Sequence, residues 1–244
     1  MTRRRLDVEL VRRGLFGSRE RAREAIESGI VTVSGTVAEK PSRQVDPAEP
    51  IELLGPGLRF VGRGGLKLEG ALDAFAIEVT GYRCLDIGSS TGGFTDCLLQ
   101  RGASAVVAVD VGTGQLDWTL RNDPRVGVME RTDVRDLDPA SMGPFDLVVV
   151  DVSFISLRTV MPALAALAGP APVVALVKPQ FEVGRGRVGA GGVVRDRSLQ
   201  DEAVAGVAGA ADAQGLSLRG SVDSPITGAE GNREVFVWLQ REGP

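Results

Sequence analysis

Acidic side chains end or directly follow short apolar runs at several points along this 244-residue chain. Carboxylates in such positions can accept hydrogen bonds from hydroxyl or amino groups of a ligand. They are Asp86, Asp110, Asp133 and Asp151, and Lys178 follows a further apolar run in the same way. Because the chain contains no histidine, any proton transfer must fall to Asp, Glu, Lys, Tyr or Cys.

The segment from Cys84 to Thr95 surrounds the first of these carboxylates. It has the order of apolar run, glycine-rich turn and helix-forming segment that opens nucleotide-binding α/β domains. Its turn, Gly88-Ser89-Ser90-Thr91-Gly92-Gly93, lacks the second glycine of the nicotinamide fingerprint G-x-G-x-x-G. The turn therefore does not imply a dinucleotide. A simpler alternative is that the glycines only form turns and the aspartates only cap helices.

The pattern Asp86-x-Gly88-x-x-x-Gly92 resembles motif I of the class I S-adenosylmethionine-dependent methyltransferases. The resemblance implies S-adenosylmethionine as the cofactor, with the glycines bringing the backbone close to its amino-acid part. Asp110 is placed to accept both ribose hydroxyls, and Asp133 could bond the adenine amino group. The expected cofactor residues are Asp86, Gly88, Ser89, Gly92, Gly93, Asp110 and Asp133.

Strand-length and helix-length segments alternate through the second part of the chain, which predicts an open, mainly parallel α/β sheet. The expected strands are 83–87, 105–109, 126–130, 147–150, 173–177, 216–222 and 234–239. Ligands of such sheets bind at the carboxyl ends of the strands, where the acidic residues fall.

Asp151 and Lys178 each follow an expected strand, so both should lie at the carboxyl-end edge of the sheet, close to one another. An amine acceptor would suggest an Asn/Asp-Pro-Pro-aromatic motif, but the chain has Val150-Asp151-Val152-Ser153-Phe154. Partial burial and a nearby sulfonium favour a neutral lysine, which could take a proton from a ribose hydroxyl. The alternative is a structural ion pair with Asp151. Lys67, on an expected helix, is by spacing alone a surface lysine.

The first 60 residues hold 11 Lys and Arg against 9 Asp and Glu, whereas the whole chain has 28 against 32. Apolar spacing predicts two helices, the second capped by Ser18, followed by a hairpin at 30–38 and a strand at 51–54. This organisation is that of a small α+β domain.

The pattern Ser18-Arg19-Glu20-Arg21-Ala22, followed by Gly29 and Val31-Thr32-Val33-Ser34-Gly35, resembles the S4 RNA-binding domain. Such domains carry arginines on one helix face and a lysine near the hairpin. With the basic N-terminus, the expected RNA-binding residues here are Arg3, Arg4, Arg19, Arg21, Arg23 and Lys40. A solvated helix face is the alternative, because glutamates are interleaved with the arginines.

Lys67, Asp151, Lys178 and Glu234 match in order and approximate spacing the Lys-Asp-Lys-Glu tetrad of the FtsJ-like RNA 2′-O-methyltransferases. With the S4-like segment in front, the whole chain resembles the TlyA, or haemolysin A, family of ribosomal RNA cytidine 2′-O-methyltransferases. The resemblance implies a Rossmann-like class I fold, ribosomal RNA or subunits as partners, and no metal. It makes Lys178 the general base or hydroxyl orienter, held by Asp151, while Lys67 and Glu234 complete the network.

The expected domains are an S4-like domain at 1–60, a linker at 61–65 and a methyltransferase domain at 66–244. Segment 184–192 has no apolar period and predicts either a lid that orders on RNA, through Arg185 and Arg187, or an ordinary flexible loop.

Phe154 is expected to be either a stacking partner for the target nucleotide or a core aromatic. Cys84 and Cys97 are expected to be small core residues. The apolar runs are too short to span a bilayer and the start lacks the apolar core of a signal peptide, which predicts a cytoplasmic protein without a membrane partner. Two other function classes stay open, a non-catalytic RNA-binding or ribosome-associated protein and a membrane-active haemolysin; the oligomeric state is open as well.

Overall fold

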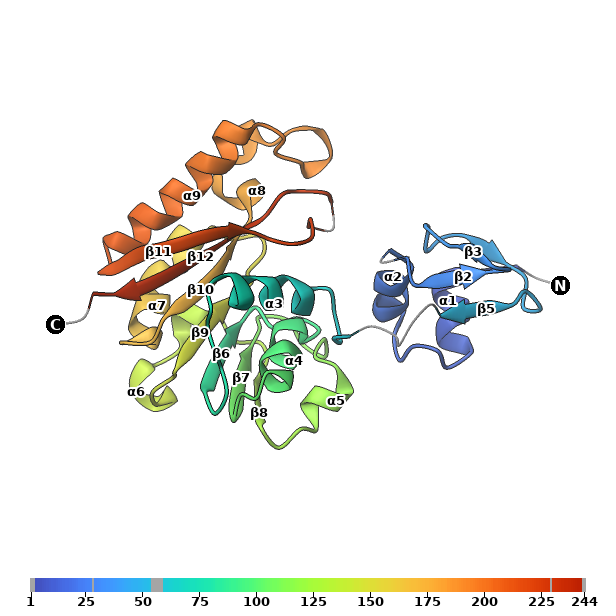
Figure 1. The fold of residues 1–244 in the computed structure, drawn as a ribbon, viewed down its shortest axis with the longest axis horizontal. Helices are drawn as coiled ribbons and strands as arrows, with labels where there is room; N and C mark the ends of the chain where they lie inside the picture. Colours follow the sequence, from blue (N-terminus) through green and yellow to red (C-terminus); the bar gives the residue numbers. More distant parts are fainter. Residues whose placement is uncertain (1–2, 28, 54–58, 229, 243–244) are drawn as a thin grey trace. The chain divides into compact units, whose positions relative to one another are not determined.

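The computed structural model describes residues 3–27, 29–53, 59–228 and 230–242, and of Arg185 it describes the backbone (Figure 1). The chain divides into two compact units, Met1–Arg63 and Gly64–Pro244. Each unit has its own hydrophobic core.

The first unit packs two helices on short strands. Its elements are β1 (Arg4–Arg5), α1 (Leu6–Arg12), α2 (Arg19–Glu27), β2 (Val31–Val33), β3 (Thr36–Val37), β4 (Gln44–Val45) and β5 (Ile51–Leu53). β3, β2 and β5 form one sheet in that order, and β1 pairs with β4. Ser18 Oγ accepts from the Arg21 backbone amide, so the expected cap of α2 is present. The pairing of β1 with β4 was not predicted, and Leu54 lies outside the described residues.

A seven-stranded sheet forms the centre of the second unit, in the order β11-β12-β10-β9-β6-β7-β8. The strands are β6 (Arg83–Ile87), β7 (Ala105–Val109), β8 (Val126–Met129), β9 (Leu147–Val150), β10 (Val173–Val177), β11 (Leu216–Asp223) and β12 (Val235–Arg241). The pairs from β8 to β10 are parallel, whereas β12 runs antiparallel to both β10 and β11. This sheet confirms the predicted Rossmann-like, mostly parallel fold class.

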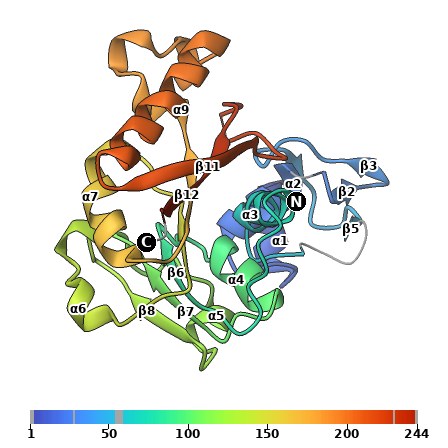
Figure 2. The same cartoon turned by 60° about the vertical axis from the view of Figure 1, so that its left-hand side comes forward.

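Helices cover both faces of the sheet, with α3 and α4 on one face and α7 and α9 on the other (Figure 2). The α-helices are α3 (Gly64–Ala74), α4 (Gly93–Gln100), α5 (Trp118–Arg121), α6 (Pro139–Met142), α7 (Leu157–Ala168), α8 (Pro179–Glu182) and α9 (Arg197–Asp212). Because both faces are covered, β9 and β10 are buried along their whole length, which explains why they are apolar runs without alternation.

The structure differs from the linker expected at 61–65, where the first unit ends and the second begins in the sequence. α3 begins at Gly64, so the last two residues of the expected linker are helical. Val61, in the expected linker, and Phe60, directly before it, are buried. The apolar period that predicts the helix begins only at Leu66, because the two glycines before it have no side chains to extend the pattern.

Cys84 and Cys97 are buried and free, as predicted for core residues, and burial raises the pKa of the Cys84 thiol to about 12. Within the described ranges, no group of His, Cys, Asp and Glu is arranged to hold a metal ion. No helix among the described residues is long and apolar enough to cross a membrane.

Candidate active site

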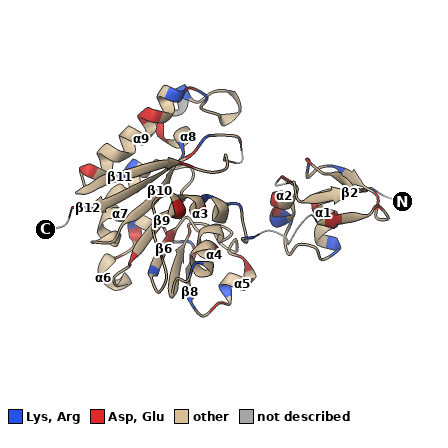
Figure 3. Ribbon diagram, viewed as in Figure 1, with Lys and Arg blue, Asp and Glu red and all other residues tan. Residues whose placement is uncertain are grey.

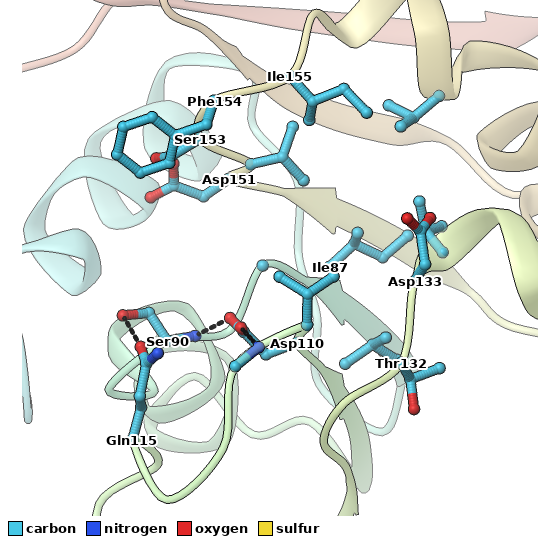
Figure 4. Close-up of a pocket in the computed structure, with 17 residues that line it drawn as sticks. Ile87, Ser90, Asp110, Gln115, Thr132, Asp133, Asp151, Ser153, Phe154 and Ile155 are labelled. Carbon is cyan, nitrogen blue, oxygen red and sulfur yellow. Dashed lines mark hydrogen bonds between the residues drawn. The ribbon is translucent and has the colours of Figure 1, made fainter.

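A cavity of about 320 Å³ opens at the carboxyl ends of β6, β7 and β9 (Figure 4). Figure 4 shows Asp110 and Gln115 on one side of it and Asp151 on the other, with Ile87 between them. Asp133 also lines it. The strand-end carboxylates predicted from the sequence therefore do converge on one cavity, with the exception of Asp86.

Asp110, directly after β7, is held by the loops on either side of it. Its Oδ2 accepts from the Ser90 amide at 2.8 Å and its Oδ1 from the Gly112 amide at 2.6 Å. Ser90 Oγ donates to Oε1 of Gln115 at 3.2 Å, which brings that amide group to the cavity wall. A carboxylate that accepts one amide per oxygen keeps a lone pair on each for two ribose hydroxyls.

Asp133 has a stronger partner than the sequence indicated. Its carboxylate accepts from the Arg135 backbone amide, Nε and Nη2 at 2.9, 2.9 and 2.6 Å. These hydrogen bonds lower the pKa of Asp133 to about 2 and cap the short helix η1 (Val134–Asp136). Asp133 is thus both a helix cap, the simpler expectation, and a wall of the cavity.

Asp86 is fully buried in β6 and lies outside the cavity lining. Thr95 Oγ1 donates to its Oδ2 at 2.6 Å, whereas its buried Oδ1 has no hydrogen-bond partner in the described part of the chain. Burial raises the pKa of Asp86 to about 7, although the hydrogen bond from Thr95 opposes the shift. Asp86 therefore holds the start of α4 through Thr95 and is not part of the cavity wall.

The glycine-rich turn joins three strand ends. The amides of Gly88 and Ser89 both donate to the carbonyl of Val109, at 2.8 and 3.2 Å. Gly88 has a φ of +83°, and a Cβ there would collide with the carbonyl oxygen of Asp151. Gly88 is thus a glycine because β6 and β9 end in contact, a reason that the sequence pattern did not reveal.

The remaining residues of the turn start α4. Gly92, with a φ of 99°, precedes the helix, and Gly93 is its first residue. Of the expected cofactor residues, Gly88, Asp110 and Asp133 line the cavity, while Ser89, Gly92 and Gly93 lie outside its lining.

Lys178 follows β10 and reaches the Asp151 side of the cavity. Its Nζ lies 2.5 Å from Asp151 Oδ1 and donates to Ser153 Oγ at 2.8 Å. The two side chains of the ion pair are 11% and 20% exposed, so the pair is largely shielded from water. Sequence reasoning brought Asp151 and Lys178 together but missed Ser153, whose residue type alone carries no such signal.

Lys67 on α3 forms a second ion pair, with Glu234. Nζ donates to Oε2 at 2.5 Å, and both side chains are buried. Val177 of β10 is opposite Val235 of β12, so Lys178 and Glu234 leave the sheet at the same end. The surface position that spacing suggested for Lys67 is wrong: the tetrad forms two ion pairs at one end of the sheet.

Phe154 is 92% exposed, so the core reading of this residue is wrong. It has a φ of 66° and lines the cavity, and its ring packs against Phe181 with 5.3 Å between centroids. The loop that carries Phe154 is held by Glu182, whose carboxylate accepts hydrogen bonds from Ser156 Oγ and from the Leu157 amide.

Both acidic and basic residues lie on α1 and α2 of the first unit (Figure 3). Asp7 is buried on α1 and accepts from Arg5 and from Arg19 Nη2 at 3.0 Å. Burial alone would raise the pKa of Asp7, but these hydrogen bonds lower it to about 2. Glu9 binds Arg12 and Arg13 in the same way and lies 3.7 Å from Arg4. Buried carboxylates therefore hold several arginines of this unit in place.

The other expected RNA-binding residues are spread over the surface. Arg3, Arg23, Lys40 and Arg187 are exposed, and Arg21 is partly buried. Arg187 donates from Nη1 and Nη2 to the carboxylate of Glu202, and the side chain of Arg185 lies outside the described part. Arg185 and Arg187 belong to segment 184–192. The last residue of this segment, Gly192, accepts a hydrogen bond at its carbonyl from the side chain of buried Asn232.

Residues 60–241 match the family model described as FtsJ-like methyltransferase, and residues 4–51 match the S4 domain. The 16S/23S rRNA (cytidine-2'-O)-methyltransferase TlyA of Mycobacterium tuberculosis is 53% identical to the chain over 241 residues, which cover 98% of the chain and 90% of the relative. The putative rRNA methyltransferase YqxC of Bacillus subtilis is 48% identical over 242 residues, with coverages of 98% and 86%. A solved structure of a putative hemolysin from Streptococcus thermophilus is 43% identical, has a TM-score of 0.78, and is matched over 100% of this chain and 90% of that one.

Proposed function

The chain belongs to the FtsJ-like methyltransferase family, and we propose that it transfers a methyl group from S-adenosylmethionine to a cytidine ribose 2′-oxygen of ribosomal RNA. The observation that carries this function is the position of the two polar groups of the cavity. Asp110 lies on one side, where a nucleoside would bind, and Asp151 with its partner Lys178 lies on the other. A full-length relative named for the same reaction supports this assignment.

The cavity fits the adenosine part of S-adenosylmethionine in size and chemistry. Its volume of about 320 Å³ lies at the lower end of the range for small-molecule pockets. Asp110 would accept the two ribose hydroxyls and Asp133 the adenine amino group, while Ile87 and Val134 supply apolar walls. When bound, S-adenosylmethionine supplies a methyl group on a positively charged sulfur.

The residues around Asp151 then hold and deprotonate the acceptor. Lys178 would accept the proton of the ribose 2′-hydroxyl, and Asp151 would stabilise the ammonium that forms. Lys67 and Glu234, as a buried pair at the same sheet end, would complete the network. Apposition of the two reactants accounts for most of the rate, since a positioned oxygen needs little further activation.

The S4 unit would bind the RNA outside the active site. Its arginines can contact phosphates bidentately, and those that Asp7 holds are already oriented before RNA arrives. Exposed Phe154, beside Asp151, is placed to stack on a base turned out of its helix. A ribosomal substrate implies a cytoplasmic protein.

Tritium transfer from labelled S-adenosylmethionine to ribosomal RNA tests the proposal. We expect the wild-type protein to label RNA, and ribose-methylation mapping to locate the label on a cytidine 2′-oxygen. Lys178→Ala should abolish transfer while S-adenosylmethionine binding, measured by calorimetry, persists. Labelling of a base instead of a ribose, or full turnover by Lys178→Ala, would contradict the proposal.

A further inference from the structure

We propose that Ser153 is a positioning residue that fixes the orientation of the Lys178 amine. The inference rests on the proposed function, because Lys178 must accept a proton for its orientation to affect the rate. Ser153 lines the cavity two residues after Asp151, and Lys178 Nζ donates to its hydroxyl oxygen at 2.8 Å.

The hydrogen-bonding capacity of an amine explains why an acceptor is needed beside the ion-pair partner. A neutral lysine has two N–H bonds and one lone pair, whereas the charged form has three N–H bonds. Ser153 Oγ accepts one N–H bond of Lys178, whereas Asp151 Oδ1, 2.5 Å from Nζ, is an ion-pair partner that accepts no hydrogen bond in the described part of the chain. The hydrogen bond to Ser153 therefore fixes one of the three staggered positions on the nitrogen, and the lone pair of the neutral form is limited to the other two.

Without Ser153, the amine would be held by Asp151 alone and could rotate about its Cε–Nζ bond. The lone pair would then be distributed over three staggered positions, of which one can face the ribose hydroxyl. When the proton is transferred, the O–H bond breaks, its electron pair stays on oxygen, and a third N–H bond forms on Lys178. The hydrogen bond to Ser153 and the ion-pair contact with Asp151 persist through this step, so no reorganisation is needed.

The loop that carries Ser153 is attached at both ends. The Asp151 amide donates to the carbonyl of Ile87 at 2.8 Å. At the other end, Ser156 Oγ donates to Glu182 Oε2 at 2.5 Å, and the Leu157 amide donates to Oε1 at 2.7 Å. Lys178 and Glu182 belong to the same segment after β10, so this segment holds the loop at two points. Ser153 is therefore presented to the lysine at a fixed place.

Kinetics of Ser153→Ala test this role. We expect the single-turnover rate of methyl transfer to fall about tenfold, while the KM for RNA and the Kd for S-adenosylmethionine change by less than about twofold. Ser153→Thr, which keeps the hydroxyl, should restore the rate to within about threefold of wild type. Ser217→Ala, on β11 and outside the cavity lining, is the matched control and should leave the rate unchanged.

An unchanged rate in Ser153→Ala would overturn the proposal. So would a loss that threonine fails to rescue, or one matched by an equal loss of binding. A second measurement works without turnover: in protein with ¹⁵N-labelled lysine, hydrogen exchange at Lys178 Nζ should be faster in Ser153→Ala, with Lys178→Arg identifying the signal. If the wild-type protein does not methylate RNA, the proposed function fails, and unchanged exchange at Nζ would refute the positioning role separately.

Discussion

Each lysine of the tetrad is paired with a carboxylate, yet the two pairs differ in surroundings. The Lys178–Asp151 pair adjoins the cavity, whereas Lys67 and Glu234 are buried between α3 and the start of β12. A Cβ at Gly228 would lie 2.6 Å from Glu234 Oε1, so the carboxylate is also packed against the backbone. The Lys67 pair therefore also joins two distant parts of the chain, besides any catalytic role.

Lys67→Met should destabilise the second unit by about 3–5 kcal/mol, because it leaves the Glu234 carboxylate buried without its partner. Urea unfolding followed by tryptophan fluorescence measures this change. The double variant Lys67→Met with Glu234→Leu is the control and should recover much of the loss, since it buries no unpaired charge. A single variant as stable as wild type would show that the pair contributes nothing to folding.

Asp86→Asn should change how stability depends on pH. The pKa of Asp86 is raised to about 7 by burial, so its contribution is fully present below about pH 4 and is lost as the pH rises through 7. Asparagine does not titrate, and its Oδ1 can still accept from Thr95. As the pH is raised from about 4 to 7, the melting temperature of the variant should therefore increase relative to that of the wild type. A difference between the two melting temperatures that stays constant over this pH range would mean that Asp86 does not titrate there.

At the scale of elements, apolar runs predicted the strands well because both faces of the sheet are covered. Four of the seven strands, including β6 and β10, have the predicted bounds. The pairing of β1 with β4 was missed because such short segments carry no period. Side-chain partners such as Ser153 and Asn232 were missed for another reason: they act through loops whose paths depend on tertiary contacts.

The resemblance to a family added what periodicity lacked. The apolar spacing along α3 predicted that Lys67 lies on the surface, because a lone lysine in an amphipathic helix is usually exposed. Only the position of Glu234, far away in sequence, makes burial of that lysine favourable. The roles of the tetrad in catalysis stay predictions, as do those of the expected cofactor and RNA contacts.

Gly88→Ala should impair both stability and methyl transfer, because its Cβ would collide with the carbonyl of Asp151 and shift the end of β9. Gly81→Ala is the matched control. Gly81 also has a positive φ, of +79°, but its Cβ would meet nothing within 4 Å. The control should cost about 1–2 kcal/mol for backbone strain alone, and Gly88→Ala about 1–3 kcal/mol more. Equal melting temperatures and activities for the two variants would argue against close contact between the strand ends.

At the scale of the whole molecule, charge is divided between the two units. The basic excess lies in the first 60 residues, and buried Asp7 and Glu9 orient part of it. The second unit is net acidic although its proposed substrate is a polyanion. Affinity for RNA should therefore depend mainly on the S4 unit, and chemistry on the other.

The double variant Arg19→Gln with Arg21→Gln should bind RNA more weakly than wild type. The magnitude of the slope of log K for RNA binding against log salt concentration should fall by about two, one for each phosphate contact that is lost. The rate at saturating RNA should stay close to wild type. Arg19→Lys with Arg21→Lys keeps the charge and serves as the control, so its salt dependence should be retained. Filter binding over a series of salt concentrations measures the RNA affinity and its salt dependence, and circular dichroism verifies that the variants fold. An unchanged slope in the glutamine variant would exclude these arginines from the RNA interface.

The position of β12 has a consequence for biosynthesis. Among the described residues, β11 pairs with β12 alone, and β12 lies between β11 and β10. Strand β11 therefore cannot join the sheet before β12, which comes later in the chain, is in place. Glu234, just before β12, meets Lys67 across 167 residues of chain. A nascent polypeptide that has not yet emerged beyond residue 234 has neither the complete sheet nor the second ion pair. Translation thus delays the second ion pair until residue 234 has left the ribosome, the same particle that carries the proposed substrate.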